Sequence, residues 1–217
     1  DRAAGDGVQQ LFRDLGVQQI VSGGQTMNPS TEDILHAAEQ VPAMDVYVLP
    51  NNKNIVMAAE QAARLARTSG VRRIHVVPTT TIPQGISAMM AYDESAEIKD
   101  NVEAMQEAAS RVQSGSVTFA ARDSDYDGHQ IKEGELLALE NGKVAFTGTD
   151  LGSVTAKVAK DLMREDSQFI TLLYGADVSE EQATDVEEAV RSLLPEEVEL
   201  TVAYGGQPVY YFLISVE

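Results

Sequence analysis

The chain has 217 residues, of which 43% are hydrophobic, and it contains no cysteine. This composition is sufficient for a packed core and excludes disulfide bonds and thiolate metal sites. The formal net charge of −18 argues against nucleic acid or an anionic membrane as partner, because both require clustered Lys and Arg. No apolar run reaches the ~20 residues of a membrane-spanning helix. Because no signal-peptide pattern is present either, we expect a soluble, cytoplasmic protein.

Acidic residues concentrate in the segments 93–107 and 177–199. Such segments are typical of solvated helix faces, and they also suit docking to a basic partner, so the sequence leaves both interpretations open. Residue 1 is Asp and not Met. We therefore expect the chain to be part of a longer protein, with active chemistry on residues outside it.

Helical patterns and short β-rich runs alternate over the first 94 residues. The predicted elements are a helix over 5–15, a strand over 17–22, a helix that begins at Ser30 with a looser capping box, a strand over 46–49, a helix over 53–66, a strand over 74–77 and a helix through 86–90. Strand and helix alternate three times. This pattern predicts an α/β lobe over residues 1–94, with a parallel sheet and right-handed crossovers.

A different pattern begins near residue 95. The predicted elements are a helix over 96–113, strands over 115–122, 135–140 and 143–147, a helix over 151–164, a strand over 169–174, a helix over 179–194 and strands over 197–204 and 209–216. Asn141-Gly142 is typical of a two-residue hairpin turn, and Ser179 with Gln182 forms a capping box. Helices interleaved with hairpins predict a second, α+β lobe over residues 95–217 with a mixed or antiparallel sheet.

Polar turns follow the three strands predicted in the first lobe. In an open parallel sheet such turns converge at the carboxyl ends of the strands, where ligands bind. Their amide, hydroxyl and ammonium groups, with the N–H groups of helix starts, suit an anionic headgroup or a partner surface. The alternative is that they only cap helices and shape turns. The candidate residues are Thr26, Asn28, Ser30, Asn51, Asn52, Lys53, Asn54, Thr79, Thr80, Thr81 and Gln84.

Catalytic and metal-binding patterns are missing from the sequence. Asn and Gln cannot act as general bases, and no His lies beside a Ser or Thr as a nucleophile–base pair would require, so we assign no catalytic residue. His36, His75 and His129 fit no metal-ligand spacing. Residues 123–128 imitate the start of a calcium loop but have Gly134 where the bidentate Glu belongs, which favours a turn. No phosphate-loop or dinucleotide motif occurs, so no cofactor is expected in this chain.

Four segments resemble one known family, in order and at plausible spacing. They read SGGQTMNPSTEDIL, LPNNKNIVMAAEQAA, VPTTTIPQGISAMMAYD and VTFAARDSDYDGHQIKEGE. They resemble the C-terminal domain of the ATP-binding subunit of bacterial fatty-acid kinases, a family related to dihydroxyacetone kinase and also described as Dak-phosphatase-like. The resemblance extends from about Gly16 to the end of the chain.

This resemblance implies a fold and a role. It implies a DegV-like (EDD) α/β lobe followed by a second α/β lobe, and a domain that docks a DegV-like fatty-acid-binding protein so that the carboxylate can be phosphorylated. It places ATP and magnesium on an N-terminal domain outside this chain.

Three hypotheses of function remain. The first is a non-catalytic docking domain of the kinase. The second is a DegV-like module that itself binds a fatty acid or another anionic ligand. The third is an independent enzyme, which the absence of a visible acid–base pair disfavours. Acyl-chain preference and oligomeric state, including a homodimer, stay open.

Overall fold

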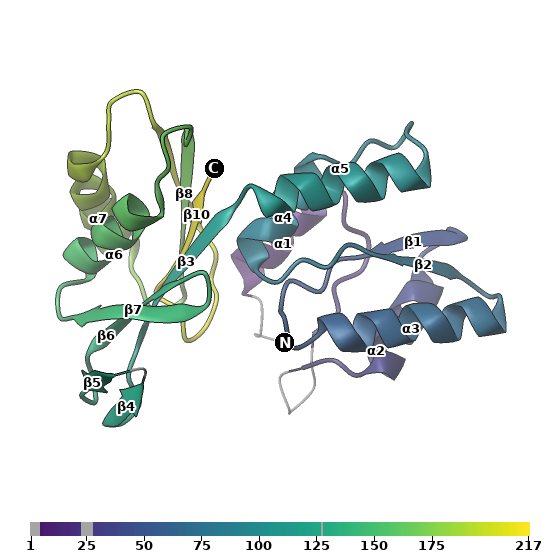
Figure 1. Ribbon diagram of the computed structural model, residues 1–217, viewed down its shortest axis with the longest axis horizontal. Helices are drawn as coiled ribbons and strands as arrows, with labels where there is room; N and C mark the ends of the chain where they lie inside the picture. Colours follow the sequence, from purple (N-terminus) through teal and green to yellow (C-terminus); the bar gives the residue numbers. More distant parts are fainter. Residues whose placement is uncertain (1–4, 23–27, 127) are drawn as a thin grey trace. The chain divides into compact units, whose positions relative to one another are not determined.

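Two compact units make up the chain in the computed structural model, which describes residues 5–22, 28–126 and 128–217. The first unit comprises residues 9–111. The second comprises residues 112–217 together with residues 5–8, so helix α1 (Asp6–Asp14) belongs to both. The sequence predicts lobes over 1–94 and 95–217, whereas these units divide after residue 111. The helix over residues 98–110 therefore lies in the first unit (Figure 1).

Helices cover both faces of a short parallel sheet in the first unit. Its elements are α2 (Thr31–Gln40), β1 (Asp45–Val48), α3 (Val56–Ser69), β2 (Arg73–Val76), α4 (Ile82–Met90) and α5 (Ile98–Ser110). β1 and β2 pair in parallel. Val46 and Ile74 pack against α2 and α3, whereas Tyr47 and Val77 pack against α4 and α5. Because successive strand residues face opposite sides, each face has its own core (Figure 1).

One predicted strand of this unit is wrong. Residues 17–22 form neither helix nor strand, and none of them is buried. Strands of parallel sheets are normally buried on both faces, so this β-prone run lacks the packing that would make it a strand. In the described part of the first unit, the parallel sheet has the two strands β1 and β2.

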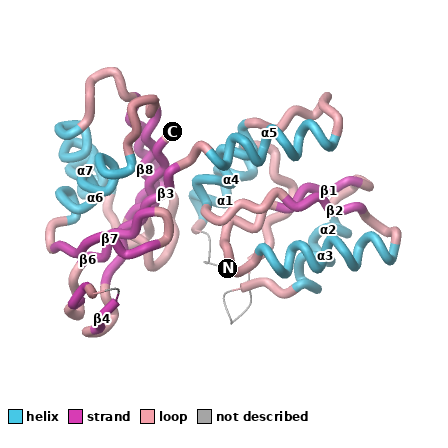
Figure 2. Tube along the Cα trace, in the orientation of Figure 1, coloured by secondary structure: helices cyan, strands magenta, loops and turns pink. Residues whose placement is uncertain are grey.

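The second unit contains a six-stranded mixed sheet, where the sequence predicts a mixed or antiparallel one. The elements are β3 (Gln113–Phe119), β4 (Ser124–Tyr126), β5 (His129–Ile131), β6 (Leu136–Glu140), β7 (Lys143–Gly148), α6 (Leu151–Leu162), β8 (Phe169–Tyr174), α7 (Glu180–Leu193), β9 (Glu199–Tyr204) and β10 (Phe212–Val216). The strand order is β7-β6-β3-β10-β8-β9. β8 and β9 are parallel, and the other neighbours are antiparallel. Figure 2 shows the strands of this sheet in magenta beside the helices α6 and α7 in cyan.

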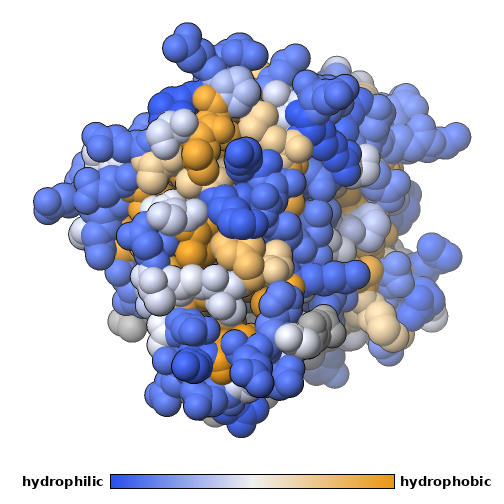
Figure 3. All heavy atoms as spheres, turned by 60° about the vertical axis from the view of Figure 1, so that its left-hand side comes forward, coloured by the Kyte–Doolittle hydropathy of each residue, from blue (hydrophilic) through white to orange (hydrophobic). Residues whose placement is uncertain are grey.

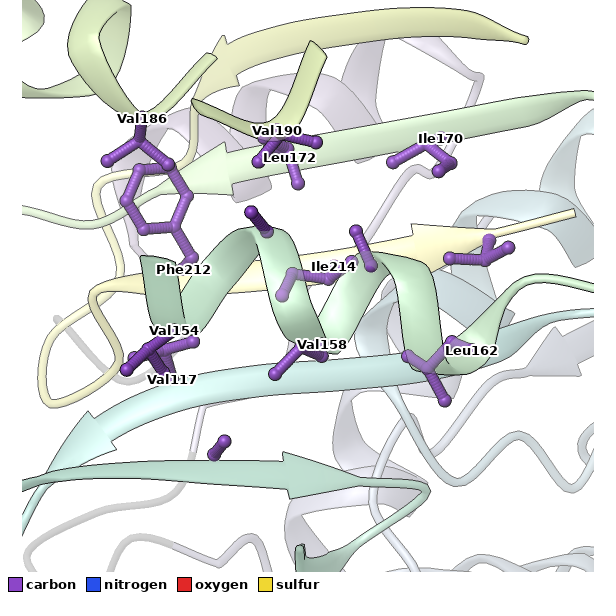
Figure 4. Close-up of a cluster of buried hydrophobic side chains, with 14 of the residues drawn as sticks. Val117, Val154, Val158, Leu162, Ile170, Leu172, Val186, Val190, Phe212 and Ile214 are labelled. Carbon is purple, nitrogen blue, oxygen red and sulfur yellow. The ribbon is translucent and has the colours of Figure 1, made fainter. Parts of the chain in front are cut away.

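Helices α6 and α7 pack on one face of this sheet over a dense core (Figure 4). Val158, Leu172, Val190 and Ile214 are fully buried there, and burial of such a side chain contributes about 1.5–3 kcal/mol. A Cβ added at Gly115 of β3 would lie 2.5 Å from Val158 Cγ1. α6 therefore lies directly on the strand at this point. Hydrophilic residues are prominent on the face turned forward in Figure 3, interspersed with hydrophobic ones.

Local sequence signals at two places are confirmed. Ser179 and Gln182 form the predicted capping box at the start of α7. Asn141 (φ 49°) and Gly142 (φ 83°) form the tight turn between β6 and β7, as a two-residue hairpin with both central residues at positive φ requires.

Candidate functional site

A hydrogen-bonded pair joins the turns that follow β1 and β2. The backbone N–H of Asn51 donates to Thr79 Oγ1 (3.0 Å), and the Thr79 hydroxyl donates to Asn51 Oδ1 (2.7 Å). The Thr79 side chain is fully buried. The structure thus brings together the second and third polar turns, as their position after adjacent parallel strands predicts.

The start of α4 fits closely against this pair. A Cβ added at Gly85 would lie 2.0 Å from Asn51 Oδ1. Asn51 itself has φ 56°, in the left-handed region that Asn tolerates better than most residues. Asn51 and Thr79 therefore hold the two turns together, and they are structural parts of the site.

Helix capping occupies the other polar residues of the third turn. Thr81 is the N-cap of α4, and its Oγ1 accepts a hydrogen bond from Gln84 N (3.2 Å). Gln84 Oε1 accepts from the N–H (2.8 Å) and the hydroxyl (3.0 Å) of Thr80. Thr80 is exposed. These contacts fix the loop, and they leave the Thr80 side chain at the surface beside a helix start.

Two side chains of the second turn are exposed to solvent. Asn52 Oδ1 accepts from Asn54 N (2.9 Å), which closes a local Asx turn. Lys53 and Asn54 are exposed just before α3. Within the described part of the chain, Lys53 makes no ion pair. The scaffold therefore presents one cation and one amide for contact.

The first turn is described in part. Ser30 caps α2, where its Oγ accepts from Asp33 N (3.1 Å) and its N–H donates to Asp33 Oδ2 (2.8 Å). The Ser30 N–H lowers the pKa of the Asp33 carboxyl. Asn28 is exposed, and Thr26 lies outside the described residues. The predicted convergence of this turn with the other two is based on a strand over residues 17–22. Those residues form no strand, so the structure removes the basis of that prediction.

Sequence reasoning missed an ionic cluster at the opposite ends of the strands. Asp45 accepts two hydrogen bonds from Arg73, each 2.7 Å, and lies 2.9 Å from His75 Nε2. The Arg73 guanidinium, and next the His75 ring, hold the pKa of the Asp45 carboxyl well below its usual range. Asp45 and Arg73 are register partners of β1 and β2. Only the register of the two strands brings Asp45 and Arg73 together, so the linear sequence carries no signal for this pair.

Strand β4 lies within the segment over residues 123–128 that imitates a calcium loop, and β5 follows it. β4 and β5 pair as a hairpin, and Asp123 Oδ1 accepts a hydrogen bond from Glu133 N (2.7 Å). Within residues 5–22, 28–126 and 128–217, no cluster of three or more His, Asp or Glu side chains is arranged to hold a metal ion. None of the helices in those ranges has the length and apolar character that a membrane crossing requires.

The fold seen in solved structures defines the class of this protein. A DegV family protein from Ruminococcus gnavus, solved with vaccenic acid, matches 97% of this chain and 84% of its own (TM-score 0.61, 13% identity). The fatty acid kinase B3 protein of Streptococcus pneumoniae, loaded with linoleic acid, matches 97% of this chain and 83% of its own, with a TM-score of 0.60 and 13% identity. The dihydroxyacetone kinase of C. freundii, in complex with AMP-PNP and Mg²⁺, matches 87% of this chain and 41% of its own, with a TM-score of 0.64 and 15% identity. The chain is thus an α/β protein with the fold of DegV and dihydroxyacetone kinase proteins.

Its sequence places the chain more narrowly. It belongs to the FakA-like C-terminal family of fatty acid kinases, whose profile matches residues 2–217. An uncharacterized protein of Staphylococcus haemolyticus is 43% identical over 213 residues, which are 98% of this chain. Protein YloV of Bacillus subtilis is 40% identical over 215 residues, or 99% of the chain. The chain spans 38% of the length of each relative. The predicted family membership is confirmed.

Proposed function

We propose that this chain is a non-catalytic domain of a fatty-acid kinase and that it docks a DegV-like fatty-acid-binding protein. The observation that carries the proposal is the exposed group formed by Lys53, Asn54 and Thr80. These side chains stand on two turns that the Asn51–Thr79 pair holds together. A pre-organised polar surface binds at lower entropic cost than a flexible one, because its side chains and loops are already ordered.

The chemistry of the proposed kinase lies outside this chain. The γ-phosphoryl group of ATP would pass to the fatty-acid carboxylate, with ADP leaving, on the nucleotide-binding domain of the longer protein with its magnesium. The present domain would hold the acyl-binding partner in position, which is the entropic part of catalysis. The proposal places this reaction in the cytoplasm. It assigns the exposed candidates Asn28 and Ser30 and the half-buried Asn52 to the rim of the surface.

A binding measurement tests this proposal. Isothermal titration of the purified chain with the DegV-like protein of the same genome should give a saturable complex. Lys53→Ala plus Asn54→Ala should weaken it about tenfold or more, as loss of central polar contacts does. Lys143→Ala, at an exposed site on β7, serves as the control and should bind like the wild type. Absence of a complex with the wild-type chain would refute the docking role.

The alternative is that the chain itself binds a fatty acid. The solved proteins of the same fold that hold vaccenic or linoleic acid favour it. The packing of the second unit argues against an acyl chain beneath α6. A Cβ at Gly115 would meet Leu162 Cδ1 at 2.9 Å, and one at Gly148 would meet Val154 Cγ2 at 2.5 Å. The helix therefore leaves no room for a lipid at either strand.

Native mass spectrometry of the chain purified from its host separates these two functions. A bound mass in the fatty-acid range on the chain alone supports the lipid-binding module. A clean protein mass that shifts only when the DegV-like protein is added supports docking.

A further inference from the structure

The loop between β9 and β10 exposes large apolar side chains. It covers residues 205–211, and its Val209 and Tyr210 are 53% and 39% exposed. Tyr204, the last residue of β9, is 45% exposed directly before the loop. These three residues, here called the 204–210 surface, all belong to the second unit. Single exposed apolar residues are normal on a protein, whereas a group of them marks an interaction site.

Hydrogen bonds to two neighbouring strands hold this loop in place. Gln207 is buried, and its Nε2 donates to the backbone oxygen of Leu173 on β8 (2.9 Å). The Thr118 hydroxyl on β3 donates to the backbone oxygen of Val209 (2.8 Å). The loop is therefore a fixed part of the second unit, and it presents its side chains in one arrangement.

Val209 has an unfavourable backbone conformation. Its φ of 71° lies in the left-handed region, which β-branched residues avoid. Such strain persists only where the surrounding contacts impose it, and it concentrates at functional positions. Because the Val209 side chain is more than half exposed, packing within the second unit does not explain a valine at this position. A contact outside the unit would explain it.

The residues before helix α1 pack against the same loop. Val8 N donates to the backbone oxygen of Gly205 (2.8 Å). A Cβ added at Gly5 would lie 2.4 Å from Gln207 N, so the two backbones touch. Val209 follows Gln207 by two residues, which places their Cα atoms at most about 8 Å apart. The polypeptide at Gly5 therefore lies close to the exposed part of the loop.

The relatives in which this domain occurs are much longer than the chain. It spans 38% of their length, and the family model that it matches describes a C-terminal part. In a protein of that length, the polypeptide from a preceding domain reaches this chain beside the 204–210 surface. A domain tethered by a short connection has an effective concentration on the order of 1 mM, so a small apolar contact is sufficient to hold it.

We propose that the 204–210 surface is the contact of this chain with the domain that precedes it in the full-length protein. The occupant is a segment of the same polypeptide, because that polypeptide enters beside the surface. Contacts between domains of one chain are smaller and more polar than permanent interfaces, which suits one valine and two tyrosines. This inference goes beyond the proposed docking of a DegV-like protein, which concerns turns of the first unit.

Thiol labelling tests the contact, since this chain contains no cysteine of its own. Tyr210→Cys is made in the 217-residue chain and in the full-length protein, whose native cysteines are replaced by serine. The rate of reaction with a maleimide should be about tenfold or more lower in the full-length protein. Lys143→Cys, at an exposed site on β7 of the same unit, is the matched control and should react equally fast in both proteins.

Three results would overturn the inference. The first is an equal rate for Tyr210→Cys in the two proteins. The second is protection in the full-length protein that disappears on dilution, because a second copy then covers the surface. The third is protection that appears only when the DegV-like protein is added, which would assign the surface to the partner. Failure of the DegV-like protein to bind would refute the proposed function and leave this inference standing.

Hydrogen exchange of the unaltered proteins provides a test without substitutions. The amides of residues 204–211 should exchange several-fold more slowly in the full-length protein than in the 217-residue chain. Equal exchange would contradict the contact even if Tyr210→Cys did not fold. Val209→Gly relieves the positive φ, so the 217-residue chain should melt no lower than the wild type. In the full-length protein the same substitution should raise the exchange rate of this loop, and an unchanged rate would count against a contact through Val209.

Discussion

Asn51 and Thr79 exchange hydrogen bonds across two neighbouring turns, although 28 residues separate them in sequence. Thr79 Oγ1 accepts from the backbone of Asn51 and donates to its side-chain oxygen. One buried hydroxyl thus satisfies two groups of the partner residue. Because the pair links the ends of β1 and β2, the position of Lys53 and Asn54 depends on it.

Thr79→Val is the direct test of this link. Valine keeps the shape of threonine but leaves Asn51 N and Asn51 Oδ1 without their partner, and each unsatisfied buried group costs ~1–3 kcal/mol. We expect the free energy of unfolding in urea to fall by about 2 kcal/mol or more. Thr80→Val, in the same turn, removes one exposed hydrogen bond to Gln84 and should cost clearly less, about 1 kcal/mol at most. Equal effects of the two substitutions would show that the link is not structural.

Gly115→Ala tests the close packing of α6 on β3. The new methyl group would overlap Val158 Cγ1 and Leu162 Cδ1, and overpacking of this kind costs typically about 1–3 kcal/mol. Val158→Ala removes the nearer atom. The double variant should therefore lose less stability than the sum of the two single variants, measured as a double-mutant cycle of unfolding free energies. Strict additivity would mean that the helix can shift away from the strand.

Sequence alone was sufficient where a few neighbouring residues decide the structure. Ser179 with Gln182, and Asn141 with Gly142, determine a helix start and a hairpin turn through contacts within four residues. Their outcome depends little on the rest of the fold, so both predictions hold. The two parallel strands β1 and β2 are predictable for a similar reason, since each is a short segment with two β-branched residues directly before a turn.

Tertiary packing decided the features that the sequence did not predict. Residues 17–22 have strand propensity but no buried side, so propensity misled. Asp45, Arg73 and His75 meet only because β1 and β2 pair in one register. Asn51, a candidate for ligand contact in the sequence, is a structural partner of Thr79 because Gly85 admits its side chain. Each of these depends on contacts across the fold, which a linear pattern does not contain.

Asp45 should contribute stability that is lost in acid. Its pKa in the folded chain lies below the ordinary value of 3.8, because Arg73 and His75 stabilise the carboxylate. The unfolded state therefore binds protons more readily as the pH falls, so the contribution is present above pH 3.8 and disappears below it. Asp45→Asn should lower the melting temperature at neutral pH and flatten its fall in acid. Arg73→Gln, which removes the main partner, should reproduce much of this effect. If both variants lose melting temperature in acid as steeply as the wild type does, Asp45 does not make this contribution.

Glu140 should act in the opposite direction. Burial, and next the neighbouring Asp161 carboxyl, raise its pKa from 4.5 to about 7, and its Oε1 is buried without a hydrogen-bond partner among the described residues. The charges that face it from α6 are Asp161 and Lys157, and Lys143 is its register partner on β7. Because the folded state holds this proton more tightly than the unfolded state, the Glu140 contribution falls as pH rises from 4.5 to about 7.

Glu140→Gln removes this titration and keeps the size of the side chain. One unit of pKa shift corresponds to about 1.4 kcal/mol, so the full shift corresponds to about 3 kcal/mol. Because Glu140 is only partly buried, solvent screening reduces this value, and we expect the variant to be more stable than the wild type by about 1–2 kcal/mol above pH 7. Below pH 4.5 the variant and the wild type should differ little in stability, since Glu140 is then protonated in both the folded and the unfolded state. Urea unfolding at acidic, neutral and alkaline pH measures this difference. Glu133→Gln, at an exposed carboxyl of the same region, is the control and should follow the wild type throughout. A Glu140→Gln curve that runs parallel to the wild-type curve at all three pH values would contradict the raised pKa.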